Sequence, residues 1–202
     1  MSKRKLVLCL GLFVCLSLPF ACGPGCENEN NLTTVTELSV SFGPYSTNFR
    51  SRESVPFDSA AFSVSIEEVV EEAITFSEFQ GFSPALMAES CAYITSLKYD
   101  LEAINITSSA AITIGGQVYE AGANLNALFA ATLPYDPIEN SINTFINEIN
   151  TDSFEFSARG SNMFLQLVQR PEQELRQTFT FEYVFEQGSV AATTSEVVIT
   201  VD

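Results

Sequence analysis

Apolar and polar residues alternate with the two-residue period of a β-strand along much of this chain, most clearly near its C-terminus. Within residues 177–187, positions 179, 181, 183 and 185 carry aromatic side chains, separated by Thr, Glu and Val. Gly188 turns the chain, and residues 190–201 return it as a β-branched run. This pattern predicts a terminal hairpin at 177–201 whose strands lie at or near the centre of a sheet.

The buried face of this hairpin is expected to be aromatic on one arm and aliphatic on the other. Across the turn, the side chains expected to oppose one another are Phe179, Phe181, Tyr183 and Phe185 on the first arm and Val197, Ile199 and Val201 on the second. Large rings on one face of a sheet must be covered, so we expect this face to contribute to the core.

Further strands are predicted by the same alternation or by β-branched composition, bounded by turn residues. Their ranges are 33–42, 62–76, 100–107, 110–114, 117–119 and 162–169, with a turn at Gly115-Gly116, a break at Arg170-Pro171-Glu172 and a possible short strand at 154–156. Residues 66–74 also fit a helical period, because Ile66, Val69 and Val70 share a helical face. The strand is the preferred interpretation, since β-branching and the preceding alternation agree, and a helix remains the alternative.

Two short helices are predicted between these strands. Asn124 can cap a helix that places Leu125, Leu128 and Phe129 on one side. Asp136 can cap a second helix, with Pro137 at its first position and an apolar stripe made by Ile138, Ile142, Phe145, Ile146 and Ile149. The predicted fold class is therefore mainly β: an antiparallel β-sandwich with two short helices, for which an immunoglobulin-like topology is one option.

The N-terminal segment predicts export and a lipid anchor. Lys3, Arg4 and Lys5 precede an apolar run at 6–18 that is short for a membrane span. Ala21-Cys22 then resembles the end of a bacterial lipobox, in which the cysteine is acylated, for example with palmitate, and becomes the first residue. Ordinary secretion is the alternative. The expected organisation is a signal peptide at 1–21, a flexible tether at 22–32 and a single domain at 33–202.

The net charge of the mature chain limits the classes of partner that it can bind. Three of the nine Lys and Arg lie in the leader, which has no acidic residue, so six basic residues would face 25 acidic ones, a formal net charge of −19. Phosphate backbones and anionic headgroups are repelled by such a surface. The chain is therefore expected to bind no nucleic acid and to meet the membrane only through its lipid anchor.

This processing leaves two of the five cysteines available for pairing. Cys9 and Cys15 leave with the leader and Cys22 carries the lipid, which leaves Cys26 and Cys91. In an oxidising compartment this pair predicts a disulfide that ties the tether to the domain. Two free thiols are the alternative.

The residue types present offer little catalytic chemistry. The chain has no His, so His-dependent nucleophilic triads and histidine zinc sites are excluded. Glu67, Glu68, Glu71 and Glu72 form the densest carboxylate set, but adjacent acids on a strand point to opposite faces, and no Asp-x-Asp-x-Asp-Gly calcium loop occurs. A solvated acidic strand edge is the preferred interpretation. The sequence thus predicts a protein that is not an enzyme, with no catalytic residue, cofactor or metal site.

Several segments together show a resemblance to a known group of proteins. They are Cys91-Ala92-Tyr93, Leu101 to Thr107, Tyr119 to Phe129, Ile142 to Ile146, Phe164 to Leu167, Arg170-Pro171-Glu172 and the terminal hairpin. With the lipobox, they resemble an uncharacterised family of small Bacteroidetes lipoproteins. The resemblance implies an outer-membrane anchor, with the domain periplasmic or surface-exposed, and transfers no functional residue. Asp58-Ser59-Ala60 is also similar to the short O-glycosylation acceptor of Bacteroidetes, which makes Ser59 a candidate modification site.

Two functions of different classes follow from these observations. The first is a non-enzymatic, lipid-anchored protein that binds or braces an envelope protein or a glycan through its surface; the sequence does not say which. The alternative is a carbohydrate-binding or carbohydrate-active accessory module. Sugar-binding modules present flat aromatic platforms, and this chain has no Trp, so the alternative depends on clustering among its Tyr residues, which are Tyr45, Tyr93, Tyr99, Tyr119, Tyr135 and Tyr183. A carboxylate-only hydrolase is the weakest option.

Overall fold

The structure, a computed structural model, describes residues 30–46, 49–73, 94–133, 136–151 and 160–201. The chain divides into two units, Met1–Asn31 with Ala73–Ile94 and Leu32–Glu72 with Thr95–Asp202. Nearly all described residues belong to the second unit, and this unit is described by itself. The short strand expected at 154–156 lies outside the described residues.

The described chain is mainly β, as predicted, with one α-helix. The strands are β1 (Asn30–Pro44), β2 (Ser54–Pro56), β3 (Ala60–Ala73), β4 (Ile94–Leu97), β5 (Leu101–Ser108), β6 (Ile112–Ile114), β7 (Gln117–Tyr119), β8 (Phe129–Leu133), β9 (Asp136–Ser141), β10 (Asn162–Leu167), β11 (Leu175–Gln177), β12 (Phe179–Phe185), β13 (Gly188–Thr193) and β14 (Val197–Thr200). The helix is α2 (Ile142–Thr151), and 3₁₀ turns lie at η1 (Phe57–Ser59) and η3 (Asn126–Leu128).

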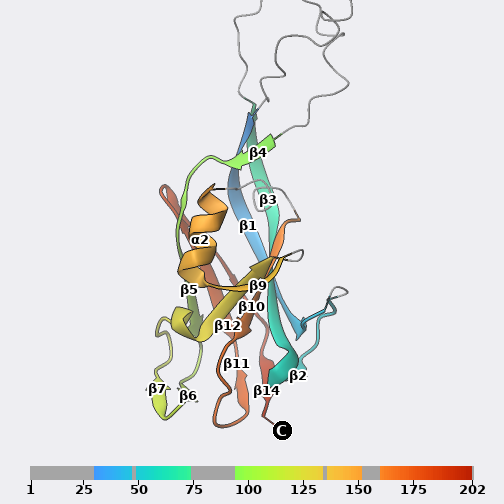
Figure 1. Ribbon diagram of the computed structural model, residues 1–202, viewed down its shortest axis with the longest axis vertical. Coiled ribbons are helices and arrows are strands. Elements are labelled where there is room, and N and C mark those ends of the chain that lie inside the picture. The colour runs from blue at the N-terminus through green and yellow to red at the C-terminus, as the bar shows by residue number, and fades with distance from the viewer. Residues whose placement is uncertain (1–29, 47–48, 74–93, 134–135, 152–159, 202) are drawn as a thin grey trace, which may run out of the picture. The chain divides into compact units, whose positions relative to one another are not determined.

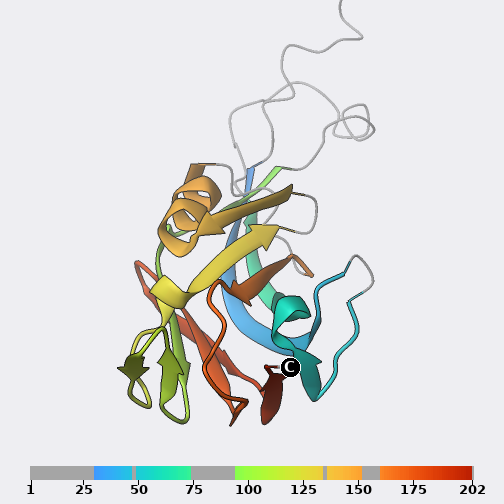
Figure 2. The ribbon, with the colours of Figure 1, turned by 60° about the horizontal axis from the view of Figure 1, so that its bottom comes forward.

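These strands form one large sheet and smaller ones. The large sheet has the order β4-β1-β3-β10-β8-β9, in which the long strands β1 and β3 run side by side (Figure 1). A second sheet has the antiparallel order β13-β12-β5, and a third has the order β11-β14-β2, with β14 parallel to β2. The β6–β7 hairpin projects beyond the end of β5 (Figure 2). Its turn is Gly115-Gly116, where φ values of 59° and 76° suit glycine, as the sequence predicted.

An aromatic cluster joins the large sheet to the β12 sheet. The Phe62 ring of β3 lies 4.9 Å from the Phe179 ring and 5.2 Å from the Phe181 ring, measured between centroids. Phe129 of β8 meets the same two rings edge-on, at 6.3 and 6.4 Å. All four side chains are buried, so these rings form the contact between the two sheets.

The terminal hairpin is confirmed in its first arm and its turn, and wrong in its second arm. Strand β12 is the middle strand of its sheet, and its aromatic side is buried. Ala192 and Val190 of β13, however, oppose Phe181 and Tyr183. The predicted aliphatic partners lie further on: Val197 and Ile199 belong to β14, which pairs with β11 and β2, and Val201 follows that strand. Three residues that form no strand, 194–196, separate β13 from β14 and let the chain change sheets.

The predicted pair of helices is wrong in number and in position. The first is only the turn η3, because Asn124 accepts the Asn126 N–H at 2.9 Å and Phe129 then starts strand β8. The second begins at Ile142, since the preceding residues form β9 against β8 and the Ser141 hydroxyl accepts the Thr144 N–H at 3.2 Å as an N-cap.

Four of the five residues of the predicted apolar stripe, Ile142, Phe145, Ile146 and Ile149, are buried on α2, whereas the fifth, Ile138, belongs to strand β9. The preferred interpretation of residues 66–74 is also confirmed through Ala73, because this segment continues strand β3, and the helical alternative is wrong.

Candidate functional site: a groove beside a free strand edge

An open groove of about 330 Å³ lies between the start of β1, the end of β4 and the β12–β13 turn. Its lining combines threonine side chains with a few aliphatic side chains and two aromatic rings, those of Tyr99 and Phe185. The residues are Thr33, Thr34, Val35, Thr36, Leu97, Tyr99, Phe185, Gln187, Gly188, Ser189 and Val190. The groove thus brings together three segments of the chain, of which the first, 33–36, and the last, 185–190, lie more than a hundred residues apart.

Hydrogen bonds fix the β1–β4 wall of this groove. The Lys98 N–H donates to the Thr33 carbonyl at 2.8 Å, and the Thr33 hydroxyl donates to the Ser96 carbonyl at 3.0 Å. The Lys98 ammonium lies 5.4 Å from the centre of the Tyr99 ring and donates to Glu72 at 2.5 Å. The hydrogen bond to Glu72 raises the pKa of Lys98 above its ordinary value. Lys98 therefore stays charged at neutral pH and holds Tyr99 at the groove.

The opposite wall continues into the free edge of strand β13. The Thr194 N–H donates to the Phe179 carbonyl, and in an antiparallel ladder hydrogen-bonded pairs recur at every second residue. The pairs that exchange backbone hydrogen bonds are therefore Phe181↔Ala192 and Tyr183↔Val190. Residues between them must aim their N–H and C=O groups away from β12. These residues are Ser189, Ala191 and Thr193, and within the described chain their outward backbone groups have no partner.

The other edge of the same sheet, strand β5, is capped by two asparagine side chains. Asn126 accepts the Ile106 N–H at 3.1 Å and donates to the Ile104 carbonyl in a very short hydrogen bond. Asn150 of α2 accepts the Leu101 N–H at 2.9 Å and donates to the Leu101 carbonyl at 3.0 Å. An amide side chain presents one donor and one acceptor, as a neighbouring strand would, so β5 is closed to further pairing.

Glu182 supplies a fixed negative charge beside the β13 edge. It lies on the outer face of β12 opposite Ala191 and accepts hydrogen bonds from Asn105 at 2.9 Å and Ser189 at 2.8 Å. These bonds, first that from Asn105 and then that from Ser189, lower the pKa of Glu182 below its ordinary value. A carboxylate held ionised in this way attracts basic partners and repels acidic ones.

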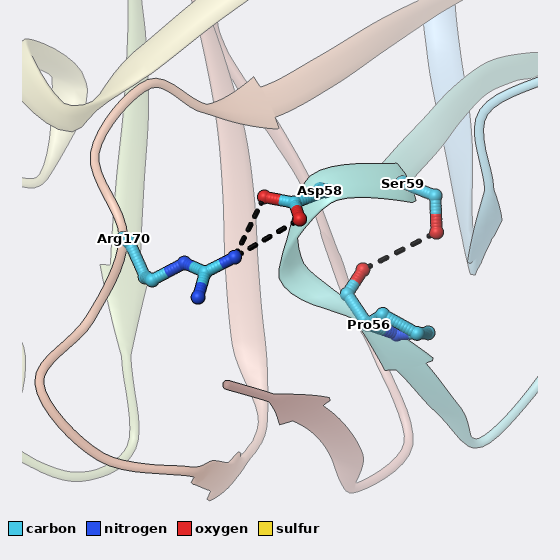
Figure 3. Close-up of polar contacts among 4 residues, drawn as sticks. All are labelled: Pro56, Asp58, Ser59 and Arg170. Atoms are coloured by element: carbon cyan, nitrogen blue, oxygen red, sulfur yellow. Dashed lines mark hydrogen bonds and ion pairs between the residues drawn. The ribbon is translucent and has the colours of Figure 1, made fainter. Parts of the chain in front are cut away.

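A smaller depression of about 250 Å³ lies near η1 and the end of β10. Asp58 lies on its rim and accepts two hydrogen bonds from Arg170, at 2.9 and 3.0 Å (Figure 3). Ser59 is half-buried and donates to the Pro56 carbonyl at 3.3 Å. The O-glycosylation candidate therefore lies on a short, ion-paired turn next to a surface depression.

The remaining residues predicted from the sequence do not converge on a site. Cys22, Cys26 and Cys91 lie outside the described residues. The four acids at 67–72 are exposed as expected, and they lie beyond the part of β3 that pairs with β10, whose register runs over Phe62–Ser65. Glu67 accepts a short hydrogen bond from Ser39. Within the described ranges, no group of three or more Cys, Asp or Glu side chains is placed to hold a metal ion.

The described tyrosines do not form a platform. Tyr183 is fully buried, Tyr45 packs edge-on against Phe164 after β1, Tyr99 lines the groove, and Tyr119 ends β7 on the projecting hairpin. Tyr93 and Tyr135 lie outside the described residues.

Sequence reasoning did not find the groove or the two capping asparagines. The spacing Asn124-Leu-Asn126 was interpreted as a helix cap, although Asn residues that follow a strand can equally bind backbone groups in a turn. Nothing local to Asn150 signals its contact with Leu101, because the two residues meet only when α2 packs against β5.

Comparison with protein-family models, with curated proteins and with solved structures found no match. In the part of the chain that the structure describes, no helix is both long and apolar enough to cross a bilayer. The site itself therefore carries the functional argument.

Proposed function

We propose that this chain is a lipid-anchored cell-envelope protein that acts by binding, without catalysing a reaction, and that its groove holds an envelope partner. The groove of about 330 Å³ is the observation that carries the proposal. It is within the size range of ligand sites, and its lining combines Thr and Ser side chains, the Tyr99 and Phe185 rings and a free strand edge. A polypeptide partner uses all of these features, because backbone groups pair with the edge and side chains enter the groove.

The anchor and the fold complete this proposal. Cys22 would carry the lipid and place the protein at the outer membrane, in the manner of the small Bacteroidetes lipoproteins that the sequence resembles. The domain would be an antiparallel β-sandwich, an arrangement supported by the packing of Phe62 and Phe129 against Phe179 and Phe181. Mass spectrometry of the membrane fraction should find Cys22 as an acylated N-terminus; a soluble product with another N-terminus would contradict the anchor.

A carbohydrate partner remains the second candidate. Tyr99 and the threonine hydroxyls of the groove could contact a sugar ring, which is the observation that favours it. Of the two rings in the groove, Phe185 is only 9% exposed, so the accessible aromatic area is smaller than the platforms of sugar-binding modules, and a polypeptide is the better fit. Digestion of a captured complex separates the two, because a protein adduct is cleaved by proteases and a glycan adduct by glycosidases.

Site-specific photo-crosslinking in the producing cells tests the groove directly. A photoreactive residue at the exposed position Gln187 should capture a discrete adduct, and the additional substitution Thr36→Arg, which fills the groove from the β1 wall, should abolish it. The matched control places the photoreactive residue at Val118, which is 55% exposed on the β6–β7 hairpin. Equal labelling at both positions, or no effect of Thr36→Arg, would refute a binding role for the groove.

Ser59 is proposed as the site of O-glycosylation. The motif Asp58-Ser59-Ala60 lies on a surface turn, and the Asp58 side chain is 75% exposed although paired with Arg170. Intact mass of the native protein should show a glycan that is absent from the Ser59→Ala variant and present in a Ser54→Ala control. An unmodified native protein would exclude this modification.

A further inference from the structure

Strand β13 lacks several of the usual forms of edge protection. Its six residues, Gly-Ser-Val-Ala-Ala-Thr, include no Pro and no charged side chain. Its pairing with β12 runs in continuous register from Thr180↔Thr193 to Phe185↔Gly188, with no bulge. Natural sheets usually blunt such edges because an exposed row of backbone groups pairs readily with another chain.

The contrast with β5 shows that this sheet is protected on one side only. Asn126 and Asn150 bind backbone groups of Leu101, Ile104 and Ile106 along β5. On β13, the outward groups of Ser189, Ala191 and Thr193 have no partner in the described chain. An open edge in a sheet whose other edge is closed restricts further pairing to one side.

We propose that β13 accepts an additional β-strand from an envelope partner, an extended segment in which apolar residues alternate with Lys or Arg. The proposal rests on the proposed binding function and specifies the partner's chemistry. Backbone groups of the incoming strand would pair with Ser189, Ala191 and Thr193, which is the strand-addition mode of peptide recognition. Its side chains would alternate between the two faces of the sheet.

The two faces beside β13 determine this alternation. On the core side, Val190 and Ala192 pack with the aromatic row of β12, so an apolar neighbour is favoured. On the outer side, Glu182 stays ionised next to Ser189, and Glu186 is exposed at the adjoining turn. A basic side chain on this face would be attracted by both carboxylates.

The same charges argue against a second copy of the chain as the occupant. Two β13 edges in register would bring their Glu182 and Glu186 carboxylates together, in a chain whose mature form carries a formal net charge of −19. Like charges placed across an interface disfavour association. A neutral or basic segment of a different protein avoids this cost.

The probe is a capped nine-residue peptide of alternating Lys and Val, titrated into the full chain in neutral detergent by calorimetry. The critical variant is Ala191→Pro, which removes one outward N–H but no bond to β12, because proline is tolerated on an edge where the N–H faces solvent. Its matched control is Ala191→Thr, which keeps the N–H. We expect Ala191→Pro to weaken binding at least tenfold and Ala191→Thr to change it less than twofold.

Two further measurements do not depend on a substitution in β13. In the unaltered chain, the peptide should slow hydrogen exchange at the Ser189, Ala191 and Thr193 amides, while Val190 and Ala192 are already protected by β12. A peptide of alternating Glu and Val should not bind. Equal binding of the acidic peptide, protection that appears elsewhere, or Ala191→Pro binding as tightly as the unaltered chain would overturn the proposal.

The outcomes also separate this proposal from the binding function on which it rests. If Thr36→Arg abolishes capture at Gln187 while Ala191→Pro leaves it intact, the groove binds a partner and strand addition is wrong. If neither variant affects capture, both proposals fail. Sedimentation of the full chain alone is the remaining control. If the chain forms a dimer that Ala191→Pro dissociates but the basic peptide does not, the occupant of the edge is a second copy of the chain. That result would overturn the partner proposed here.

Discussion

The contact between Phe62 and Phe181 offers a direct test of how the large sheet packs on the β12 sheet. Phe62 belongs to β3 and Phe181 to β12, both side chains are at most 1% exposed, and their ring centroids lie 5.2 Å apart. Truncating either ring to Ala would cost about 3–5 kcal/mol, a large part of a typical domain stability of about 5–15 kcal/mol. Phe→Leu is the better perturbation, because it removes the ring and keeps most of the volume.

The expected magnitude follows from the geometry of the pair. Buried aromatic pairs at this separation contribute about 0.5–1.5 kcal/mol beyond the area they bury. In a double-mutant cycle, Phe62→Leu and Phe181→Leu should therefore be non-additive by about that amount, since the second substitution finds the ring contact already lost. Each of the two rings also contacts Phe129, so the coupling should fall toward the upper part of this range.

Urea unfolding of the four proteins, prepared as the soluble mature chain with Cys22→Ser, measures the coupling free energy. The slope of unfolding free energy against urea concentration should stay constant through the cycle, so that midpoints can be compared. A control cycle pairs Phe181→Leu with Val118→Ala on the exposed hairpin and should be additive. If the Phe62–Phe181 cycle is also additive to within about 0.3 kcal/mol, the two sheets do not pack through these rings and the sandwich proposal fails.

Three further predictions test the strand cap, the pH dependence and the disulfide. Asn150→Ala should lower the free energy of unfolding in urea by about 1–3 kcal/mol, because the Leu101 N–H and C=O lose their partners. Asn147→Ala, on the exposed side of α2, should cost less than about 0.5 kcal/mol. Equal costs would refute the capping role of Asn150. Hydrogen bonds lower the pKa of Glu182 in the folded state, so its contribution to stability is present at neutral pH and is lost as the pH falls below its ordinary pKa of 4.5. Glu182→Gln should therefore make the free energy of unfolding depend less on pH between pH 6 and pH 3. Parallel pH curves for the two proteins would contradict this. Non-reducing peptide mapping should find Cys26 linked to Cys91, a loop closure that stabilises by about 4 kcal/mol in the chain-entropy model, and two alkylatable thiols in native protein would exclude the bond.

The sequence alone determined several of the strands, among them β3, β10 and β12, and the buried face of β12. Alternation placed Phe179, Phe181 and Tyr183 on one face of β12, and β-branching favoured a strand over a helix in β3. Both signals are local, because side-chain direction alternates along any extended chain whatever lies beside it. The glycine pair at 115–116 is local in the same way, since only the backbone conformation of the turn selects it.

Tertiary structure alone decided which strands lie side by side. Ile199 suits a buried strand equally well opposite β12 or between β11 and β2. It lies in the third sheet because the three-residue break after β13 lets the chain change sheets, and because Val55 of β2 pairs with it in parallel. The β9 segment has the sequence of a helix start, but its pairing with β8 overrides that preference. Asn150 becomes a cap for β5 only after α2 has packed.

The same distinction applies to the proposed site. The sequence shows an acidic chain, and the export and lipid anchoring proposed above rest on one contiguous segment of it. The groove and the free edge of β13 depend on which backbone groups remain unpaired after every strand has found its neighbours. That property belongs to the completed pairing of the sheets, because each hydrogen bond joins two segments and no single segment specifies it.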